Sequence, residues 1–112
     1  MNIQFRIDEN RQGSFFIEED GKQLAELDFE IHNNVLNAYH TGVRKELEGQ
    51  GIAGKLFLEM IKYARDNGYM VTPSCSYVKA KFLRNPEKYY SLWYHREDEP
   101  TGMDGDKDKK DK

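Results

Sequence analysis

The stretch Glu48-Gly49-Gln50-Gly51-Ile52-Ala53-Gly54-Lys55 places three glycines within six residues, directly before a segment with helical apolar periodicity. The first N–H groups of a helix lack intrahelical acceptors, and the helix dipole adds partial positive charge at the same end. Glycine has no Cβ, so a bulky group can approach its backbone closely. The stretch therefore predicts a strand-to-helix turn that binds a phosphate-bearing ligand.

The segment after this turn has the pattern of an amphipathic helix. Ile52, Leu56, Met60 and Ala64 recur at four-residue spacing, which predicts about four turns packed on a sheet. The pair Asn67-Gly68 is a typical helix C-terminus.

The segment before the turn is typical of short antiparallel strands. Apolar and polar residues alternate most clearly between Ala25 and Ile31, where the polar positions are acidic. Asp20-Gly21 and His32-Asn33-Asn34 are expected turns. The expected strands span residues 3–7, 14–18, 25–31 and 35–43.

The segment beyond the helix predicts one more strand and two short helices. Residues 69–72 are too few for a helix and favour a buried fifth strand that ends at Pro73. Ser74 or Ser76 is expected to cap a helix that runs to about Leu83, and Asn85-Pro86 to begin another that ends near Trp93. The expected fold is α+β, with a mainly antiparallel, twisted sheet of about five strands.

Composition limits the class of protein. The 112 residues fit one domain, expected at residues 1–96, while residues 97–112 are almost devoid of apolar side chains and are expected to be disordered. The chain has no apolar run of membrane-spanning length and no signal-peptide pattern, and its one cysteine favours a reducing, cytoplasmic location. Residues 44–88 carry nine basic and five acidic side chains, which suits a polyanionic small molecule and is too few for a nucleic-acid interface.

Two well-known glycine motifs match the letters of the turn but not its context. Gly49, Gly51 and Gly54 fit the dinucleotide-binding pattern G-x-G-x-x-G, which requires a parallel βαβ unit and a later acidic residue. Gly49 to Lys55 also fits the start of a P-loop, but Leu56 stands where that motif needs a Ser or Thr hydroxyl for Mg²⁺.

The whole pattern resembles the GNAT superfamily of N-acetyltransferases, in its small single-domain branch. The resemblance covers about residues 3–93. The residues that carry it are His40-Thr41-Gly42-Val43, Gly49 to Leu56, Tyr63-Ala64-Arg65, Pro73 to Val78, and Asn85-Pro86. The Gln/Arg position of the superfamily's pyrophosphate motif is Glu46 in this chain.

The resemblance implies acetyl-coenzyme A (acetyl-CoA) as cofactor and places the thioester where the fourth and fifth strands separate. Cys75 is then a candidate nucleophile, or an acid toward the leaving thiolate, and His40 a candidate base for Cys75 or for the acceptor amine. Independently of the resemblance, the expected helix start beside Cys75 would lower its pKa. The implied cofactor-binding residues are Thr41, Val43, Glu48, Gly49, Gln50, Gly51, Ile52, Ala53, Gly54 and Lys55.

The leading hypothesis is transfer of an acetyl group from acetyl-CoA to an amine of a protein, a peptide or a small molecule. One alternative is a non-catalytic acyl-CoA-binding or protein-interaction module, which Glu46 favours, and another is a purely structural partner protein. No residue spacing indicates a metal site. We expect a monomer or a weak homodimer.

Overall fold

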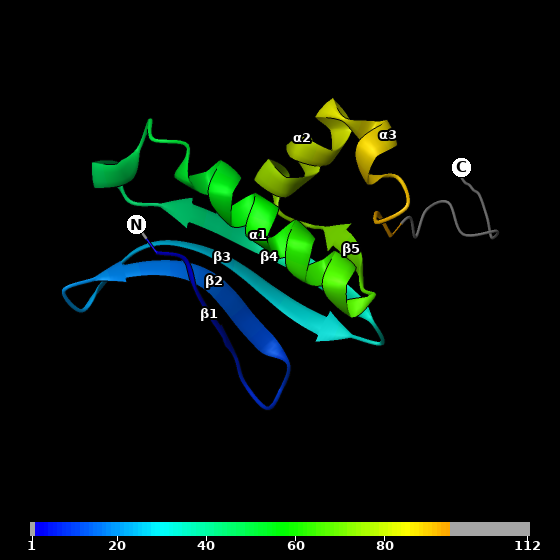
Figure 1. Cartoon of the computed structure of the whole chain (residues 1–112), viewed down its shortest axis with the longest axis horizontal. Helices are drawn as coiled ribbons and strands as arrows, with labels where there is room; N and C mark the ends of the chain where they lie inside the picture. Colours follow the sequence, from blue (N-terminus) through cyan, green and yellow to red (C-terminus); the bar gives the residue numbers. More distant parts are fainter. Residues whose placement is uncertain (1, 95–112) are drawn as a thin grey trace.

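The computed structural model describes residues 2–94, which form one five-stranded sheet with its helices (Figure 1). The strand order β1-β2-β3-β4-β5 follows the chain, and only the β4–β5 pair is parallel. The expected α+β fold is thereby confirmed. The elements are β1 (Gln4–Ile7), β2 (Gln12–Glu19), β3 (Lys22–His32), β4 (Val35–Val43), a 3₁₀ turn η1 (Lys45–Leu47), α1 (Ile52–Asn67), β5 (Met70–Pro73), α2 (Ser76–Arg84) and α3 (Pro86–Tyr89).

The hairpins of the meander use residues that tolerate positive φ. Asp20 and Gly21 have φ of 54° and 76°, and Asn33 and Asn34 have φ of 52° and 64°. Two consecutive residues of positive φ match the right-handed twist of the flanking strands. Both predicted turns are confirmed, while the second and third strands are longer than predicted because pairing continues to the turn residues.

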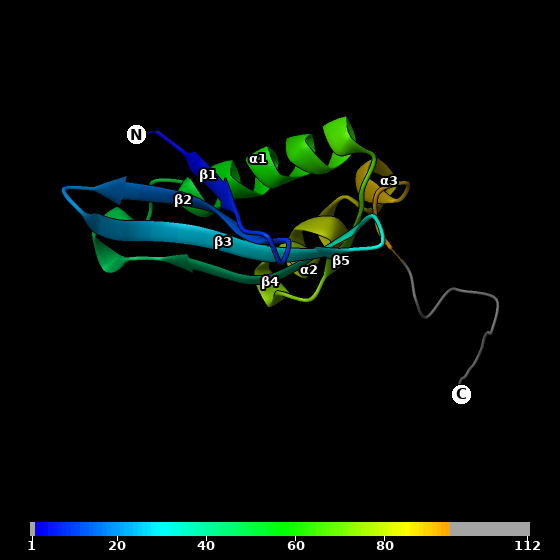
Figure 2. The same ribbon diagram turned by 90° about the horizontal axis from the view of Figure 1, so that it is seen from below.

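Helix α1 begins and ends at left-handed glycines. Gly51 has φ 73° at its N-cap and Gly68 has φ 74° at its C-cap, where the Gly68 N–H bonds the carbonyls of Ala64 and Arg65. Seen along the sheet in Figure 2, α1 lies on one face. Its buried side chains are Ile52, Leu56, Phe57, Met60, Ile61 and Ala64, as its periodicity predicts.

Strands β4 and β5 pair over only four residues, from Val35–Met70 to Ala38–Pro73. After Pro73 the chain turns, and the Ser74 N–H bonds the Thr72 carbonyl at 3.0 Å. Strand β4 continues to Val43 with β3 on one side, and no described strand pairs with its residues 39–43 on the other. The two strands therefore part at Ala38, and α2 begins in the opening.

Two predictions for the C-terminal segment are wrong. Neither serine caps α2: Cys75 occupies the N-cap position without a side-chain cap bond, and the Ser74 hydroxyl bonds Asn37 Oδ1 at 2.6 Å. Helix α3 ends at Tyr89 rather than near Trp93, because the chain turns back to β5, where the Val71 N–H bonds the Leu92 carbonyl at 2.7 Å. Leu92 and Trp93 are buried beside Val71 and do not continue the helix.

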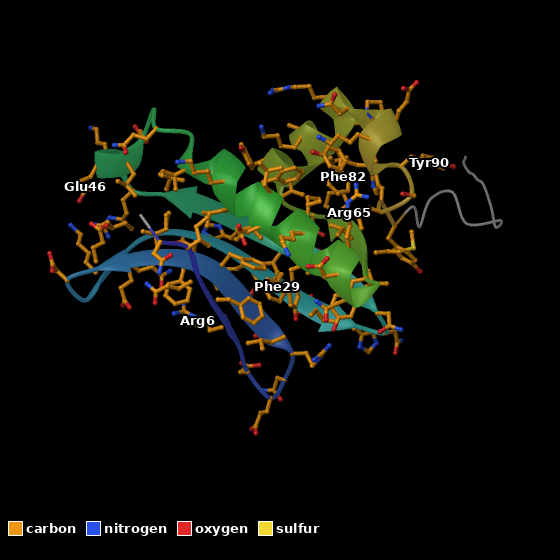
Figure 3. All side chains as sticks on the ribbon, in the orientation of Figure 1. Arg6, Phe29, Glu46, Arg65, Phe82 and Tyr90 are labelled. Carbon is orange, nitrogen blue, oxygen red and sulfur yellow. The ribbon has the colours of Figure 1, made fainter. Side chains whose placement is uncertain are left out.

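Aromatic side chains fill both ends of the core. Phe29 contacts Phe15 and Tyr63 beneath α1, while Phe82 joins α2 to α1 and α3 through Phe57 and Tyr89, with ring centroids 6.0 and 5.1 Å away. Figure 3 shows Phe29 and Phe82 in these positions. The opposite face of the sheet carries no described helix over β2 and β3. There the Arg6 guanidinium lies 4.1 Å from the centroid of the Phe16 ring.

The packing of α2 gives a direct test. Phe82 has no exposed surface, whereas its neighbour Leu83 is 58% exposed. Phe82→Ala should lower the free energy of unfolding by about 3–5 kcal/mol, and Leu83→Ala by less than about 0.5 kcal/mol. Chemical denaturation followed by circular dichroism measures both; equal losses would contradict the description of α2 as a helix packed by one face.

Candidate active site

Cys75 stands where β4 and β5 separate. Its N–H bonds the Ala38 carbonyl at 2.9 Å, and its extended backbone (φ −74°, ψ 132°) turns the chain into α2. The side chain is half-buried, and the thiol donates to Thr41 Oγ1 at 3.4 Å. A β4 side chain and the first residue before α2 thus meet across the opening.

The surroundings of Cys75 favour its ionised form. Burial alone would raise the pKa of the thiol, but hydrogen bonds from the Thr41 hydroxyl and from the N–H groups of Val78, Tyr77 and Thr41 lower it by more, so that the pKa lies below its ordinary value. Two of these N–H groups belong to the first turn of α2, where the helix dipole also favours negative charge. The lowered pKa of Cys75 agrees with the sequence prediction, although no serine caps α2.

His40 lies on the other face of the sheet. It pairs with Asp28 across the β3–β4 ladder, whereas Thr41 pairs with the fully buried Leu27. The exposed imidazole Nε2 lies 3.0 Å from Glu26 Oε2. A Cβ at Gly42 would collide with that carboxylate and lie 3.1 Å from His40 Nε2, so glycine leaves room for the pair.

The structure therefore brings Cys75 together with Thr41, and His40 together with Glu26. No hydrogen bond joins His40 to Cys75 among residues 2–94. Of the two roles considered for His40, that of a base for Cys75 has no supporting contact, while that of a base for an incoming amine is compatible with its exposed position.

The predicted phosphate-binding turn has the required openness. Gly49 and Gly51 have φ of 83° and 73°, and a Cβ at either would meet nothing within 4 Å. Gly51, Ile52, Ala53 and Gly54 span the N-cap and first turn of α1, whose N–H groups have no acceptor within the helix. The exposed side chain of Lys55 begins the second turn. Exposed N–H groups, open space and a nearby cation fit a pyrophosphate.

The carboxylate of Glu46 is paired with two basic side chains and does not line the glycine turn. Its Oε2 accepts a hydrogen bond from Lys22 Nζ at 2.9 Å, and Arg44 Nε lies 3.9 Å from Oε1. The Lys22 hydrogen bond is the main reason that the Glu46 pKa lies below its ordinary value. Figure 3 shows Glu46 on η1, at the far end of the loop from α1. An acid at this position favoured a non-catalytic module, but the positive charges of Lys22 and Arg44 offset the negative charge of Glu46.

Sequence reasoning missed Glu26 and Tyr77. Glu26 reads in the sequence as one of three alternating surface acids, and only the β3–β4 register places it beside His40. Tyr77 Oη would lie 3.7 Å from a Cβ at Gly54, so this α2 side chain reaches the first turn of α1. Both contacts join residues that are distant in the sequence, so no local pattern predicts them.

Comparison with known proteins identifies the class. The sequence model of the family described as GCN5-related N-acetyltransferase matches residues 14–92. A GCN5-like protein from Staphylococcus aureus has 29% identity and a TM-score of 0.59 over 91% of this chain and 98% of its own. The ribosomal-protein-S18-alanine N-acetyltransferase of Escherichia coli (17% identity, TM-score 0.54) has the same fold over 71% of this chain and 54% of its own. An aminoglycoside acetyltransferase from an uncultured soil metagenomic sample has it too (17% identity, TM-score 0.53), over 86% of this chain and 66% of its own.

The chain belongs to the GCN5-related N-acetyltransferase family, as its sequence resemblance indicates. It is an acetyltransferase by class, and acetyl-CoA is the cofactor of this family. Within residues 2–94, no group of three or more His, Cys, Asp and Glu side chains is arranged for a metal ion. None of the described helices is long and apolar enough to cross a membrane. The predicted boundary at residue 96 and the tail at 97–112 lie outside the described residues.

The Thr41 contact makes the ionisation of Cys75 testable. Thr41→Val keeps the shape of the side chain but removes the hydroxyl that donates to the thiolate, so the pKa of Cys75 should rise. The pH profile of iodoacetamide alkylation should then shift to higher pH. Thr72→Val on β5 is the matched control and should leave the profile in place. An unshifted Thr41→Val profile would contradict the assigned contact.

Proposed function

We propose that this protein transfers the acetyl group of acetyl-CoA to a primary amine by way of Cys75. The observation that supports this most is the group of donors around the thiol, at the point where β4 and β5 separate. Three backbone N–H groups and one hydroxyl stabilise a thiolate there without an imidazole.

The chain offers one continuous path for the cofactor. The turn from Glu48 to Lys55 would hold the pyrophosphate through Gly49, Gln50, Gly51, Ile52, Ala53 and Gly54, and the free edge of β4 at Thr41 and Val43 would hold the pantetheine arm. The bound cofactor supplies an acetyl thioester. All of these residues are in one run of β4, η1 and α1, so the strand and the turn present their N–H groups in sequence.

The proposed transfer has two steps. The Cys75 thiolate attacks the thioester carbon, and the carbon–sulfur bond to CoA breaks as the new thioester on Cys75 forms. The amine then attacks the carbonyl carbon of S-acetyl-Cys75 and gives its proton to His40, and the carbon–sulfur bond breaks to release the amide and the Cys75 thiolate. In this proposal the N–H groups of Thr41, Tyr77 and Val78, which favour the thiolate, would also stabilise the negative charge that develops on the carbonyl oxygen.

His40 and Glu26 serve the amine in this proposal. Glu26 fixes the orientation of the imidazole, since its carboxylate lies 3.0 Å from Nε2. The pair is on the sheet face opposite α1, where no helix of residues 2–94 covers β2 and β3, so an amine attached to a large molecule could approach it. Asp28 and Glu30 share this face and would attract a cationic acceptor. The acceptor class is accordingly a protein, a peptide or a small polyamine-like amine.

Calorimetric titration tests the cofactor assignment. Acetyl-CoA and CoA should both bind, and ATP and NAD should bind at least about 10-fold more weakly because neither carries a pantetheine arm for the β4 edge. Lack of binding by both CoA species would refute the proposed function together with its cofactor site.

Mass spectrometry tests the role of Cys75. Incubation with acetyl-CoA alone should add one acetyl group to Cys75, removable by hydroxylamine, and Cys75→Ala should lose both the adduct and turnover. Turnover that persists in Cys75→Ala would instead indicate direct attack by the amine and exclude the covalent route.

Steady-state kinetics test the role of His40. His40→Ala should lower the rate of amine acetylation by about 100-fold but leave acetylation of Cys75 intact, because the imidazole has no contact with the thiol. His32→Ala is the matched control, since His32 is likewise an exposed histidine of the sheet, at the last residue of β3. Equal effects of both substitutions would remove His40 from the mechanism.

A further inference from the structure

A pocket of about 470 Å³ lies over β1, β2, β3 and β4, on the face of the sheet opposite α1. Cross-strand pairing fixes its position relative to His40. Ser14 pairs with Asp28, and Asp28 pairs with His40, so the three side chains share one face. Ser14 and Asp28 line the pocket. The pocket is therefore next to the imidazole that is assigned to the acceptor amine, since the Cβ atoms of such a cross-strand pair are about 5 Å apart.

A β-bulge brings Tyr39 into the same pocket. On β3, Asp28 pairs with His40, but the next residue, Phe29, pairs with Ala38. Tyr39 is therefore an extra residue of β4, without a partner in the β3 ladder. Ala38 has no exposed surface, whereas Tyr39 is 45% exposed and lines the pocket. The bulge thus places a phenol and an imidazole side by side on the face opposite α1.

The described lining of the pocket has more acidic than basic side chains. Asp8 and Asp28 line it, and Arg6 is its single base. The Arg6 guanidinium lies 4.1 Å from the centroid of the Phe16 ring and donates to Gln23 Oε1 at 3.0 Å. Neither of these partners lines the pocket, so the positive charge of Arg6 is directed away from the two carboxylates.

The electrostatic potential at Tyr39 is negative. Burial raises the pKa of the phenol, and the carboxylates of Asp28, Glu30 and Asp8 raise it further. These acids come from β3 and from the turn after β1, so they act on the ring from two sides. An aromatic ring in a negative potential is a favourable contact for an ammonium group.

Ser14 adds a buried hydrogen-bond acceptor. The residue is only 3% exposed. Its hydroxyl donates one long bond of 3.4 Å to the Phe15 carbonyl, and no group of residues 2–94 donates to its oxygen. Buried polar atoms rarely stay without a partner. An ammonium group donates hydrogen bonds and accepts none, so it suits this oxygen and the two carboxylates together.

We propose that this pocket binds a second ammonium group of the acceptor, so that the protein prefers an aliphatic diamine to a monoamine. The inference rests on the proposed function, in which His40 receives the proton of the reacting amine. With one ammonium held between Asp28 and Tyr39, a short methylene chain would place the other amine beside the imidazole. Ser14, Asp28 and Tyr39 then determine specificity, because they contact the end of the acceptor that does not react.

The experiment compares putrescine, a butane chain with an amine at each end, with n-butylamine, the same chain with one amine. Steady-state kinetics on the full chain should give putrescine a kcat/KM about 10-fold higher or more, as expected for one charge-assisted contact. Calorimetric titration without acetyl-CoA should show putrescine binding about 10-fold more tightly than butylamine.

Substitutions in the pocket should lower the putrescine-to-butylamine ratio of kcat/KM. We expect a decrease of about 10-fold for Asp28→Asn, which removes a carboxylate, and about 5-fold for Ser14→Ala, which removes the hydroxyl. Tyr39→Leu removes the ring and should lower the ratio by about 3-fold. Tyr39→Phe keeps a ring and should have a smaller effect than Tyr39→Leu.

Glu9→Gln is the matched control. Glu9 is an exposed acid next to Asp8 that does not line the pocket, so its replacement changes the net charge as Asp28→Asn does and should preserve the ratio. Circular dichroism should show the same fold for all variants. Equal kcat/KM for the two amines in the wild-type protein would overturn the inference while leaving the proposed function standing, and so would a ratio that persists in Asp28→Asn and Tyr39→Leu. If neither amine is acetylated, the proposed function is overturned and the inference falls with it.

Discussion

The hydrogen bond from the Cys75 N–H to the Ala38 carbonyl is the last backbone–backbone hydrogen bond between β4 and the segment that follows β5 in the described part of the chain. The residue at which this hydrogen bond is made determines the position of Cys75 relative to β4. Beyond it β4 runs on with one free edge, and α2 starts with its first N–H groups turned toward a single thiol. A ladder longer by two residues would close the opening and bury the thiol between strands. The ladder stops there because the chain turns at Ser74, whose N–H bonds the Thr72 carbonyl at 3.0 Å.

The sheet divides the candidate chemistry between its two faces. Thr41 and Cys75 are on the face that packs on α1, next to the basic surface of α1 and α2, while Glu26, Asp28 and His40 are on the uncovered face. In the proposed function, an anionic donor and a cationic acceptor would therefore meet complementary charge on opposite sides of one strand.

Local patterns predicted most of the fold because its elements are locally consistent. The alternation in β3, the four-residue apolar spacing in α1 and the Asn and Gly turn residues each determine structure within a few positions. The glycine turn was predictable for the same reason. The end of α3 was not, because burial of Leu92 and Trp93 against Val71 outweighs helix propensity, and neither was the partner of His40, because cross-strand register is non-local. The position of Cys75 was inferred from family resemblance, but its amide surroundings required the structure.

On β3 and β4, the side chains that stabilise the core lie on one face of the sheet, and the exposed side chains lie on the other. Core packing rests on the inward side chains of these strands, such as Leu27 and Phe29, whereas their outward neighbours contribute little buried apolar surface. Exchange of an outward residue leaves the core contacts intact, apart from Gly42, where a side chain would strike Glu26. Such a surface can drift through many sequences at nearly constant folding free energy. Under the proposed function, the acceptor face of this small scaffold could therefore change readily in evolution, while the turn, the opening and the thiol would constrain the donor side.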